Sequence, residues 1–429
     1  MRINFITLGC YKNLVDTEIL ATYLSKNKIN IAFEAQAQKN DIVVINTCGF
    51  IESAKAQSIE TILEYIELKQ QGKIKDVYVI GCLSQRYKQE LEQEIPEVSK
   101  YFGVNLKEIL QSFDIDYQKE LYGERLISTP SHYAYLKISE GCDRKCSFCA
   151  IPFIRGRHTS EPMDRIIKQA QVLEGKGVKE LIIIAQDTSY YGYDLYNEFK
   201  LPELLQNLSE QTNIDWLRLH YLYPTPQIEN ILQVMADYPN ICRYIDLPLQ
   251  HISDNILKSM RRGYDKKFVY NLLEKIHKYL PDAVIRTAFI VGYPGETQKE
   301  YYELLNFIKE VKFDRLGVFE YSHEESTYAY KKYEDQVPEE TKRERLEQIM
   351  AVQEEISALK NQKRIGETYK VLIDRKEGDF FIGRTQYDSP EIDNEVIIKA
   401  SQTLKIGNFY KVKITESYEF DLLGKIIQN

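Results

Sequence analysis

The sequence predicts an α/β protein in which two domains with parallel sheets are followed by a small β-barrel. Three observations predict it. Short apolar runs alternate with helical patterns along most of the chain, the alternation restarts on a larger scale near residue 130, and short β runs separated by turns dominate the end. Alternating strands and helices are typical of parallel sheets. A chain of 429 residues is long enough for two or three such domains.

Residues 1–125 are expected to form an α/β domain with a parallel sheet. Its candidate strands are short apolar runs, at 1–8, 41–47 and 76–82, with helical patterns such as 53–70 and 84–94 between them. Ligands of such sheets collect at the carboxyl ends of the strands. A polar stretch around 112–132 predicts a linker to the next domain.

Residues 130–337 are expected to form a partial (β/α)₆ barrel. Helical segments such as 164–175 and 297–310 separate six candidate strands, which lie at 133–138, 180–186, 215–221, 244–249, 284–291 and 315–321. Six strand–helix units are two short of a closed (β/α)₈ barrel, so the barrel should be open. Its working face should again be the carboxyl ends of the strands.

The remaining chain predicts a connecting helix and a small β-barrel. The helix spans 338–363, because Pro338 starts a run without Gly or Pro that has apolar residues at helical spacing. Residues 364–429 change to short β runs at 368–374, 394–399 and 409–415, with glycine-containing turns between them. That pattern is typical of a small β-barrel.

The bulk composition is that of a globular protein, with 43% hydrophobic and 28% charged residues. No stretch approaches the roughly 18 consecutive apolar residues of a membrane helix, and the N-terminus is too short and polar for a signal peptide. The sequence therefore predicts a soluble, cytoplasmic protein. A net charge of −8 argues against a surface built as a whole to attract nucleic acid, although a local basic groove would escape that argument.

The chain has seven cysteines, an odd number without an export signal. That is a poor disulfide framework, and the cytosol keeps thiols reduced. Metal or redox chemistry is the better interpretation.

Cys142, Cys146 and Cys149 form a C-x3-C-x2-C motif directly after the first barrel strand. Three thiolates on one loop can ligate three irons of a [4Fe–4S] cluster and leave the fourth iron open to a small molecule. The alternative is a structural zinc site. Zinc usually has four protein ligands, and no fourth Cys or His follows at close spacing, since His158 lies nine residues on.

This motif, with Phe148 before its last cysteine and a (β/α)₆ pattern around it, resembles the radical S-adenosylmethionine superfamily. The resemblance implies that the open iron binds S-adenosylmethionine. It also implies that one electron from the cluster cleaves this cofactor to a 5′-deoxyadenosyl radical, which abstracts a hydrogen from unactivated carbon. The protein then supplies orientation and the exclusion of water.

Cys10, Cys48 and Cys82 each fall at or just past a predicted strand end, so the fold could bring them together. Taken alone, each could equally be a small buried hydrophobe. Together with the triplet they resemble the methylthiotransferase family, and the resemblance implies that they hold a second, auxiliary [4Fe–4S] cluster. Cys242 matches neither set and is interpreted as structural.

Two branches of that family compete, one modifying an adenosine of tRNA and the other an aspartate of the small-subunit ribosomal protein S-twelve. Several segments resemble the second branch: LGC at 8–10, KNLVD at 12–16, ISEGCD at 138–143, AIP at 150–152 and GRTQYDSPEID at 383–393. The resemblance covers essentially the whole chain, and the final barrel resembles a TRAM domain. One departure is Tyr11, where the family usually has proline.

The charge of the C-terminal region favours the same branch. Residues 364–429 contain 10 Lys and Arg against 11 Asp and Glu, a net charge of −1. An RNA-binding barrel normally has a basic face. The acidic residues Asp388, Glu391 and Asp393 would suit a basic protein partner, and the alternative is a solvated acidic turn.

Further polar residues near predicted strand ends are candidates for contacting S-adenosylmethionine or substrate: Gln186, Asp187, His220, Gln250, His251 and Arg286. Each could instead be a satisfied polar residue. Tyr190, Tyr191 and Tyr193 could line a pocket or pack a domain interface. The turn at 292–297 is interpreted as a capping box between Thr297 and Glu300 rather than as a cofactor contact.

The resemblance implies a methylthio group placed on the β-carbon of an aspartate, with S-adenosylmethionine as both radical source and methyl donor. Implied partners are the ribosomal protein, free or in the small subunit, and an electron donor such as flavodoxin or ferredoxin. Two rival hypotheses remain, a tRNA methylthiotransferase with the same two clusters and a zinc-stabilised, non-enzymatic ribosome-binding protein. Nothing in the sequence demands more than a monomer.

Overall fold

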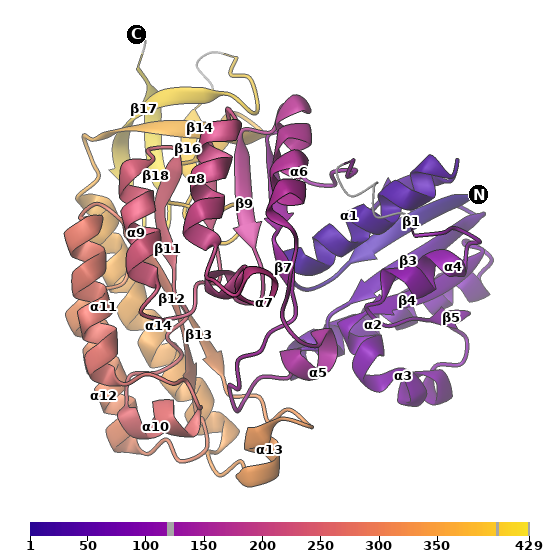
Figure 1. The fold of residues 1–429 in the computed structure, drawn as a ribbon, viewed down its shortest axis with the longest axis horizontal. Helices are drawn as coiled ribbons and strands as arrows, with labels where there is room; N and C mark the ends of the chain where they lie inside the picture. The colour runs from indigo at the N-terminus through magenta and orange to yellow at the C-terminus, as the bar shows by residue number, and fades with distance from the viewer. Residues whose placement is uncertain (118–123, 400–402, 428–429) are drawn as a thin grey trace.

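The computed structural model describes residues 1–117, 124–399 and 403–427, and it confirms the predicted fold class (Figure 1). The N-terminal region contains a five-stranded parallel sheet in the order β2-β1-β3-β4-β5. Its strands are β1 (Arg2–Thr7), β2 (Asn30–Phe33), β3 (Asp41–Thr47), β4 (Asp76–Gly81) and β5 (Lys100–Tyr101). The central strand β3 is buried along its whole length, which is why it reads as an uninterrupted apolar run.

Four helices flank this sheet: α1 (Tyr11–Lys26), α2 (Glu52–Gln70), α3 (Cys82–Glu94) and α4 (Leu106–Gln111). Helix α1 is buried over most of its length, polar residues included, because the next domain covers its outer side. Apolar residues of α1 share one core with Tyr135 of β6 and Ile184 of β9 in that domain. The N-terminal sheet is thereby joined to the inner face of the barrel.

The central region is a six-stranded parallel sheet in the order β13-β12-β11-β10-β9-β6. Its two outer strands do not pair with each other in the described chain, so the barrel is open as predicted. The strands are β6 (Tyr133–Lys137), β9 (Glu180–Ile184), β10 (Trp216–Leu219), β11 (Ile241–Asp246), β12 (Val284–Val291) and β13 (Arg315–Glu320).

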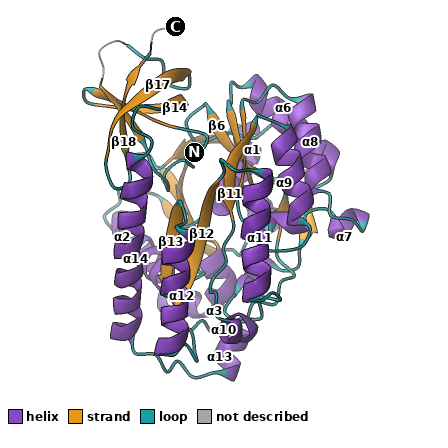
Figure 2. Ribbon diagram, turned by 90° about the vertical axis from the view of Figure 1, so that its left-hand side faces the viewer, coloured by secondary structure: helices purple, strands orange, loops and turns teal. Residues whose placement is uncertain are grey.

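Long helices cover the outer face of this sheet (Figure 2). They are α6 (Met163–Gly175), α8 (Leu201–Gln211), α9 (Ile228–Asp237), α11 (Lys266–Tyr279) and α12 (Gln298–Val311), followed by α14 (Glu339–Gln362), which packs against β13. Short elements fill the carboxyl side: β7 (Ser139–Glu140), β8 (Thr159–Ser160), α5 (Ile151–Arg155), the 3₁₀ turn η2 (Thr188–Tyr190), α7 (Tyr193–Tyr196), α10 (Asp254–Ser259) and α13 (Tyr328–Lys332).

The C-terminal region is a closed five-stranded barrel in the order β14-β15-β16-β18-β17. Its strands are β14 (Thr368–Glu377), β15 (Phe380–Arg384), β16 (Val396–Lys399), β17 (Phe409–Ser417) and β18 (Leu422–Ile426). The three runs expected from sequence correspond to β14, β16 and β17. The other two strands are short, and each contains a glycine, Gly383 or Gly424, so their β signal is weak.

This barrel packs on the amino-terminal ends of the central strands, opposite the expected working face. Trp216, Cys242 and Val284, from the starts of β10, β11 and β12, form an apolar cluster with Leu372 and Phe409 of the barrel. Cys242 is fully buried in this cluster.

The acidic segment between β15 and β16 was expected on the surface, and the structure corrects this. Asp388 is fully buried and paired with Arg315 of β13. The Asp393 carboxylate is 2% exposed and accepts a 2.6 Å hydrogen bond from the Tyr244 hydroxyl. Glu391 is exposed, yet it accepts a hydrogen bond from Tyr133. The segment extends into the open barrel, so Asp388 and Asp393 neutralise interior cations and are not available to a partner.

The buried pair predicts a pH-dependent contribution to stability. The Asp388 carboxyl loses solvation on burial, but the Arg315 guanidinium beside it holds its pKa below the ordinary value of 3.8. A carboxylate with a lowered folded pKa stabilises the fold above its unfolded pKa, and the gain is lost as the pH falls through the lower folded value. Asp388→Asn should therefore reduce the free energy of unfolding at pH 7 by about 2 kcal/mol.

Urea unfolding of this variant beside wild type, at pH 7 and at steps below pH 4, measures the effect. The difference should shrink with acidification. Asp379→Asn, at an exposed aspartate of the same barrel, is the matched control and should be near neutral. Equal stability of the Asp388 variant and wild type at pH 7 would contradict the pairing.

Among the described residues, no helix combines the length and apolar character that crossing a membrane requires.

Candidate active site

The cysteine triplet lies on the loop that follows β6 and the short strand β7. The Cys142 amide donates to the carbonyl of Gly156 at 3.1 Å, and β7 pairs with β8, so the loop is closed at its base. Gly141 has a φ of +75°, and a Cβ there would lie 2.0 Å from the carbonyl oxygen of Arg157. This position therefore requires glycine, which explains the Gly-Cys pair seen in the sequence.

The far end of the loop is fixed to α10 and α13. The Ser147 amide donates to the Met260 carbonyl at 2.9 Å, and the Ala329 amide donates to the Ser147 carbonyl at 2.7 Å. The Ser147 hydroxyl lies 2.8 Å from the Tyr293 hydroxyl. Tyr293 belongs to the turn at 292–297, and the capping box between Thr297 and Glu300 is present there. The loop is thus fixed at both ends before any cofactor binds.

Burial raises the pKa of two of the triplet thiols, Cys142 and Cys149. It raises the pKa of Cys142 to about 12, and the nearby Asp187 carboxylate acts in the same direction. The pKa of Cys149 is also raised by burial and by its neighbours Cys146 and Cys142. The Arg262 guanidinium points its Nη1 at the Cys146 Sγ, 3.2 Å away. A metal bound here would displace the thiol protons, and Arg262 would offset part of the resulting negative charge.

All three thiols line one cavity of about 400 Å³, a volume that suits a cofactor. Its walls include Phe153 of α5, Tyr328 of α13 and several Lys and Arg side chains. The cavity lies where the carboxyl ends of the barrel strands meet α5, α10 and α13, as the barrel pattern predicts.

The second set of cysteines lies at the carboxyl edge of the N-terminal sheet. Cys10 follows β1, Cys48 follows β3 and Cys82 opens α3 directly after β4, and these three strands are neighbours. Gly9 has a φ of +86°, and a Cβ there would lie 2.9 Å from the Cys48 Sγ. Only glycine at position 9 allows the turn before Cys10 to approach Cys48 this closely.

Cys82 is the most buried of these three thiols, and burial raises its pKa to about 12, with Cys10 and Cys48 acting in the same direction. Arg155 opposes this rise in the Cys82 pKa, and Asn13 accepts the hydrogen of the Cys82 thiol. Arg155 places Nε 3.4 Å from the Cys82 Sγ, and the Asn13 Oδ1 lies 3.6 Å from the same sulfur. The Cys82 side chain also packs against Ala150 and Ile154, which follow Cys149.

Arg155, at the end of α5, connects the two sets of cysteines. Its Nη1 lies 2.5 Å from Asp16 Oδ2 and 3.3 Å from Glu140 Oε2, and its Nη2 lies 2.5 Å from Asn13 Oδ1. Lys137 bridges the same two carboxylates. Desolvation by burial raises the pKa of Glu140, but Lys137 and Arg155 outweigh this effect and lower that pKa to about 2. One buried ionic network therefore spans the domain boundary between the two thiol sets.

Neither thiol set forms a site for a single metal ion in the described residues. Within residues 1–117, 124–399 and 403–427, no three His, Cys, Asp or Glu side chains are close enough to share one ion. A cubane cluster does not require this, since each thiolate binds a different iron. A structural zinc site, which needs four convergent ligands, has no counterpart in these residues.

The other candidate residues divide between the cysteine side of the barrel and its interior. Asp187 is buried and accepts a 2.7 Å hydrogen bond from Arg144 Nε, and Gln186 Nε2 donates to Glu140 Oε1 at 2.6 Å. Gln250 forms a β-bridge with Phe289 and has a φ of +70°. Buried His251 lies 3.3 Å from Glu296 Oε2.

His220 and Arg286 face the inserted acidic segment rather than the cavity. His220 Nε2 lies 2.9 Å from the Ser389 hydroxyl, and burial lowers its pKa to about 3. Arg286 lies 2.9 Å from Asp246 and 3.7 Å from Asp393. Beside His220, the segment between β15 and β16 occupies the barrel interior, so the predicted contact of His220 with S-adenosylmethionine or substrate stays a prediction.

The three neighbouring tyrosines have different roles. Tyr191 is fully buried, and its hydroxyl donates to the Glu161 carbonyl at 2.9 Å. Tyr193 is exposed and stacks on Phe199. The Arg144 guanidinium lies over the Tyr190 ring at 5.2 Å. Tyr190 is thus placed beside the triplet loop, whereas Tyr191 belongs to the core.

Arg155 and Arg262, the two arginines that approach cysteine sulfurs, were not identified from sequence. Each arginine is distant along the chain from the sulfur that it contacts. The local sequence around each does not distinguish it from a surface arginine. No sequence signal short of the fold itself could have found them.

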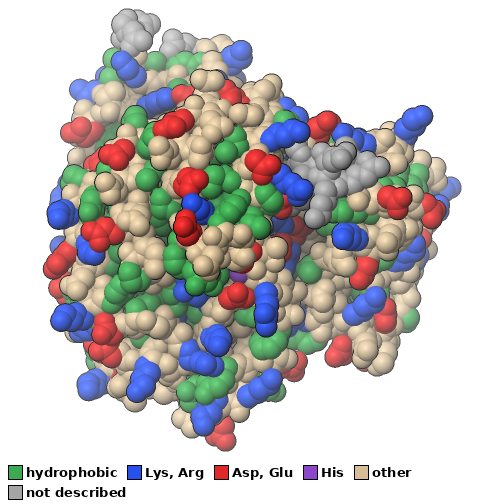
Figure 3. All heavy atoms as spheres, in the orientation of Figure 1, with side chains coloured by type: hydrophobic (Ala, Val, Ile, Leu, Met, Phe, Trp, Pro, Cys, Tyr) green, Lys and Arg blue, Asp and Glu red, His purple; other side chains and the backbone are tan. Residues whose placement is uncertain are grey.

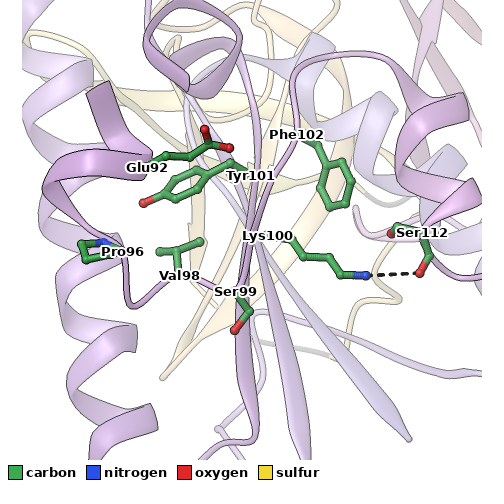
Figure 4. A pocket seen from close by; sticks show the side chains of 8 residues that line it. All are labelled: Glu92, Pro96, Val98, Ser99, Lys100, Tyr101, Phe102 and Ser112. Atoms are coloured by element: carbon green, nitrogen blue, oxygen red, sulfur yellow. Dashed lines mark hydrogen bonds between the residues drawn. The ribbon is translucent and has the colours of Figure 1, made fainter. Parts of the chain in front are cut away.

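Another cavity, of about 470 Å³, lies at the β5 edge of the N-terminal sheet (Figure 4). Its side chains lie on both sides of β5, and the Lys100 ammonium donates to the Ser112 carbonyl at 3.4 Å. None of its eight lining residues is a cysteine or a histidine. It offers no set of groups that would bind a metal.

Three family models match the chain, one in each domain. The Radical SAM superfamily matches residues 136–308, the TRAM domain matches residues 365–427, and the uncharacterized protein family UPF0004 matches residues 2–103.

Similar proteins align over essentially the full length. The ribosomal protein uS12 methylthiotransferase RimO of Cytophaga hutchinsonii is 54% identical, with 100% of this chain and 98% of that protein covered. The protein of the same name from Christiangramia forsetii is also 54% identical, over 99% of this chain and 94% of that protein. That of Phocaeicola vulgatus is 51% identical, over 99% of both.

Solved structures share the fold at low sequence identity. The radical S-adenosylmethionine methyltransferase TsrM from Kitasatospora setae aligns with a TM-score of 0.54 and 12% identity over 74% of both chains. The cobalamin-dependent S-adenosylmethionine radical enzyme OxsB aligns with a TM-score of 0.51 and 12% identity, over 76% of this chain and 54% of that one.

Proposed function

This chain belongs to the RimO family of radical S-adenosylmethionine methylthiotransferases, and we propose that it replaces one hydrogen on the β-carbon of an aspartate in ribosomal protein uS12 by a methylthio group. Relatives of that name match the whole chain at about half identity. The arrangement of the six cysteines carries the radical chemistry of the proposal, and the names of the relatives support the choice of uS12 as substrate. Each of the two parallel sheets has three at its carboxyl edge, and α5 lies between the two sets.

We assign the triplet Cys142, Cys146 and Cys149 to the cluster that binds S-adenosylmethionine, and Cys10, Cys48 and Cys82 to an auxiliary [4Fe–4S] cluster. Bound there, a cluster with S-adenosylmethionine supplies a carbon-centred radical able to remove a non-acidic hydrogen, and S-adenosylmethionine also supplies the methyl group. Arg262 and Arg155 place positive charge beside one sulfur of each set.

Tyr11 contacts both of the other domains and helps to hold the three domains together. The Tyr11 ring stacks on Tyr135 of β6 with 4.1 Å between ring centroids, and its hydroxyl donates to the Pro390 carbonyl at 3.4 Å. Tyr11 replaces the usual proline beside Cys10, so in this chain that position joins all three domains. This contact between the domains supports the exclusion of water from a radical reaction.

The electron for each radical would come from a low-potential carrier of the flavodoxin or ferredoxin type. With uS12 as substrate, either free or in the small ribosomal subunit, we propose that the enzyme acts in the cytoplasm.

The test is a competition between two substrates. The protein is reconstituted anaerobically with iron and sulfide and incubated with S-adenosylmethionine, a low-potential reductant, recombinant uS12 and unmodified tRNA, and both products are analysed by mass spectrometry. We expect one methylthio group on an aspartate-containing peptide and none on tRNA. Modification of adenosine with uS12 unchanged would refute the proposed substrate.

A further inference from the structure

Exposed cations that form no ion pair in the described chain line the cavity at the cysteine triplet. We define the basic rim as Lys145, Arg157, Arg261 and Lys331, all of which line this cavity and are exposed. In the described part of the chain none of these four side chains forms an ion pair with a carboxylate. Figure 3 shows Lys and Arg side chains gathered at the end of the molecule that carries α10 and α13.

The rim has the opposite sign to the protein as a whole. The chain carries a net charge of −8, whereas the cavity lining has five Lys and Arg, including Arg144, against one acidic residue, Asp143. The Asp143 carboxylate already accepts a hydrogen bond from the His158 amide. An acidic protein would be repelled by the overall charge and attracted to this rim, which is how charge distributions steer an encounter.

Exposed aromatic side chains lie between these cations. Phe153 is 59% exposed and Tyr328 is 43% exposed. The Arg261 guanidinium lies 4.5 Å from the Tyr328 ring centroid, and the Lys331 ammonium lies 5.9 Å from that of Phe153. Aromatic residues and arginine are enriched in protein–protein interfaces. The rim therefore combines charge that would steer a partner with apolar surface that a partner could cover.

We propose that the basic rim is the docking surface for an acidic, low-potential electron-carrier protein. The inference rests on the proposed function, because it takes the triplet as the site of the cluster that must be reduced. One electron passes from the reduced carrier to the cluster, the carrier is oxidised, and no bond forms or breaks. A carrier seated on the rim faces the cavity that all three thiols line, so the electron does not have to cross a domain.

A nucleic acid is the other polyanion that a basic surface could bind, and the geometry favours the carrier. Nucleic-acid binding uses a basic groove or stripe that follows several phosphates. The rim instead lines a single cavity of about 400 Å³. Redox encounters are typically small and weak.

The test measures cluster reduction by stopped flow in the reconstituted full-length protein. The variants are Arg261→Glu/Lys331→Glu, the single variant Lys331→Glu, and the matched control Lys28→Glu/Lys39→Glu, which changes the same net charge at exposed lysines of the N-terminal domain. Reduced flavodoxin is the protein donor and dithionite is the small-molecule donor. With flavodoxin at low salt, the rate should fall about tenfold or more for the double variant, less for the single variant, and not for the control.

Rates with dithionite should fall far less than rates with flavodoxin, and the flavodoxin rates of all variants should converge at high salt. Wild-type rates with flavodoxin for both rim variants would overturn the proposal. So would unchanged flavodoxin rates combined with lost binding to a small-subunit RNA fragment, which would assign the rim to nucleic acid. If the double variant is also slow with dithionite, the proposal is judged on the flavodoxin rate of the single variant Lys331→Glu. Because the readout is cluster reduction, absence of uS12 modification with normal reduction would count against the proposed substrate alone.

Discussion

Cys146→Ala should abolish the cleavage of S-adenosylmethionine and with it all methylthio transfer, while the N-terminal thiol set keeps its iron. Each thiolate of a cubane binds a different iron, so the loss of one ligand leaves two irons without protein ligands at this site. The loop itself should persist, because the backbone hydrogen bonds of Cys142 and Ser147 fix it without the Cys146 side chain. We expect iron to fall from about eight to about four atoms per chain, with no detectable 5′-deoxyadenosine.

The matched control is Cys242→Ala. Cys242 is equally a cysteine of the central region, but it is fully buried in an apolar cluster with Trp216 and Leu372 at the opposite ends of the strands. Its replacement should cost some stability and leave the iron content and S-adenosylmethionine cleavage unchanged. Normal cleavage by the Cys146 variant, or loss of iron from the Cys242 variant, would refute the ligand assignment.

The fold was predictable from sequence wherever the hydrophobic pattern was strong. The six barrel strands were each identified because they are buried and apolar, and α14 was identified because Pro338 marks its start. The strands β2 and β5 were not identified, since one is four residues long and the other two. Short strands owe their position to pairing with neighbours, and pairing is not visible in a local pattern.

The location of the cysteines was predictable because parallel strands end at a common edge. Cys10, Cys48 and Cys82 follow strands that proved to be neighbours. The acidic segment shows the limit of the same reasoning. Asp388 and Asp393 are typical surface residues by composition, and only the insertion of their loop among Arg315, Arg286 and Tyr244 makes them interior residues. The charge argument for a protein substrate therefore fails, and the family relationship alone supports it.

Arg155 is the residue whose importance the sequence concealed most completely. It follows the triplet on α5, yet its guanidinium contacts the other domain, where it reaches Asp16, Asn13 and the sulfur of Cys82. Its side chain is 3% exposed, as is expected of a charge that is fully paired. A charged group in such a place stabilises the protein only as long as its partners remain, because removal of one partner leaves the others buried without compensation.

Arg155→Met should accordingly destabilise the protein by roughly 3–5 kcal/mol and release iron from the N-terminal set first. Methionine retains the length of the side chain but leaves Asp16 with Lys137 as its one remaining cation among the described residues, and it removes the positive charge beside Cys82. Urea unfolding and iron retention on gel filtration measure the two effects. Arg155→Lys should restore only part of each, because an ammonium cannot reproduce the guanidinium fork that contacts several groups at once.

Arg157→Met is the matched control, since Arg157 lies two residues further on with an exposed side chain that forms no ion pair in the described chain. It should change the free energy of unfolding by less than about 0.5 kcal/mol. If the ionic network joins the two thiol sets, a substitution beside one set should release iron from the other. The Met variant should lose iron from Cys10, Cys48 and Cys82 although the substituted residue belongs to the segment of Cys149. If iron is instead lost first from the triplet, or from both sets equally, Arg155 serves its own loop and the domains dock by other contacts.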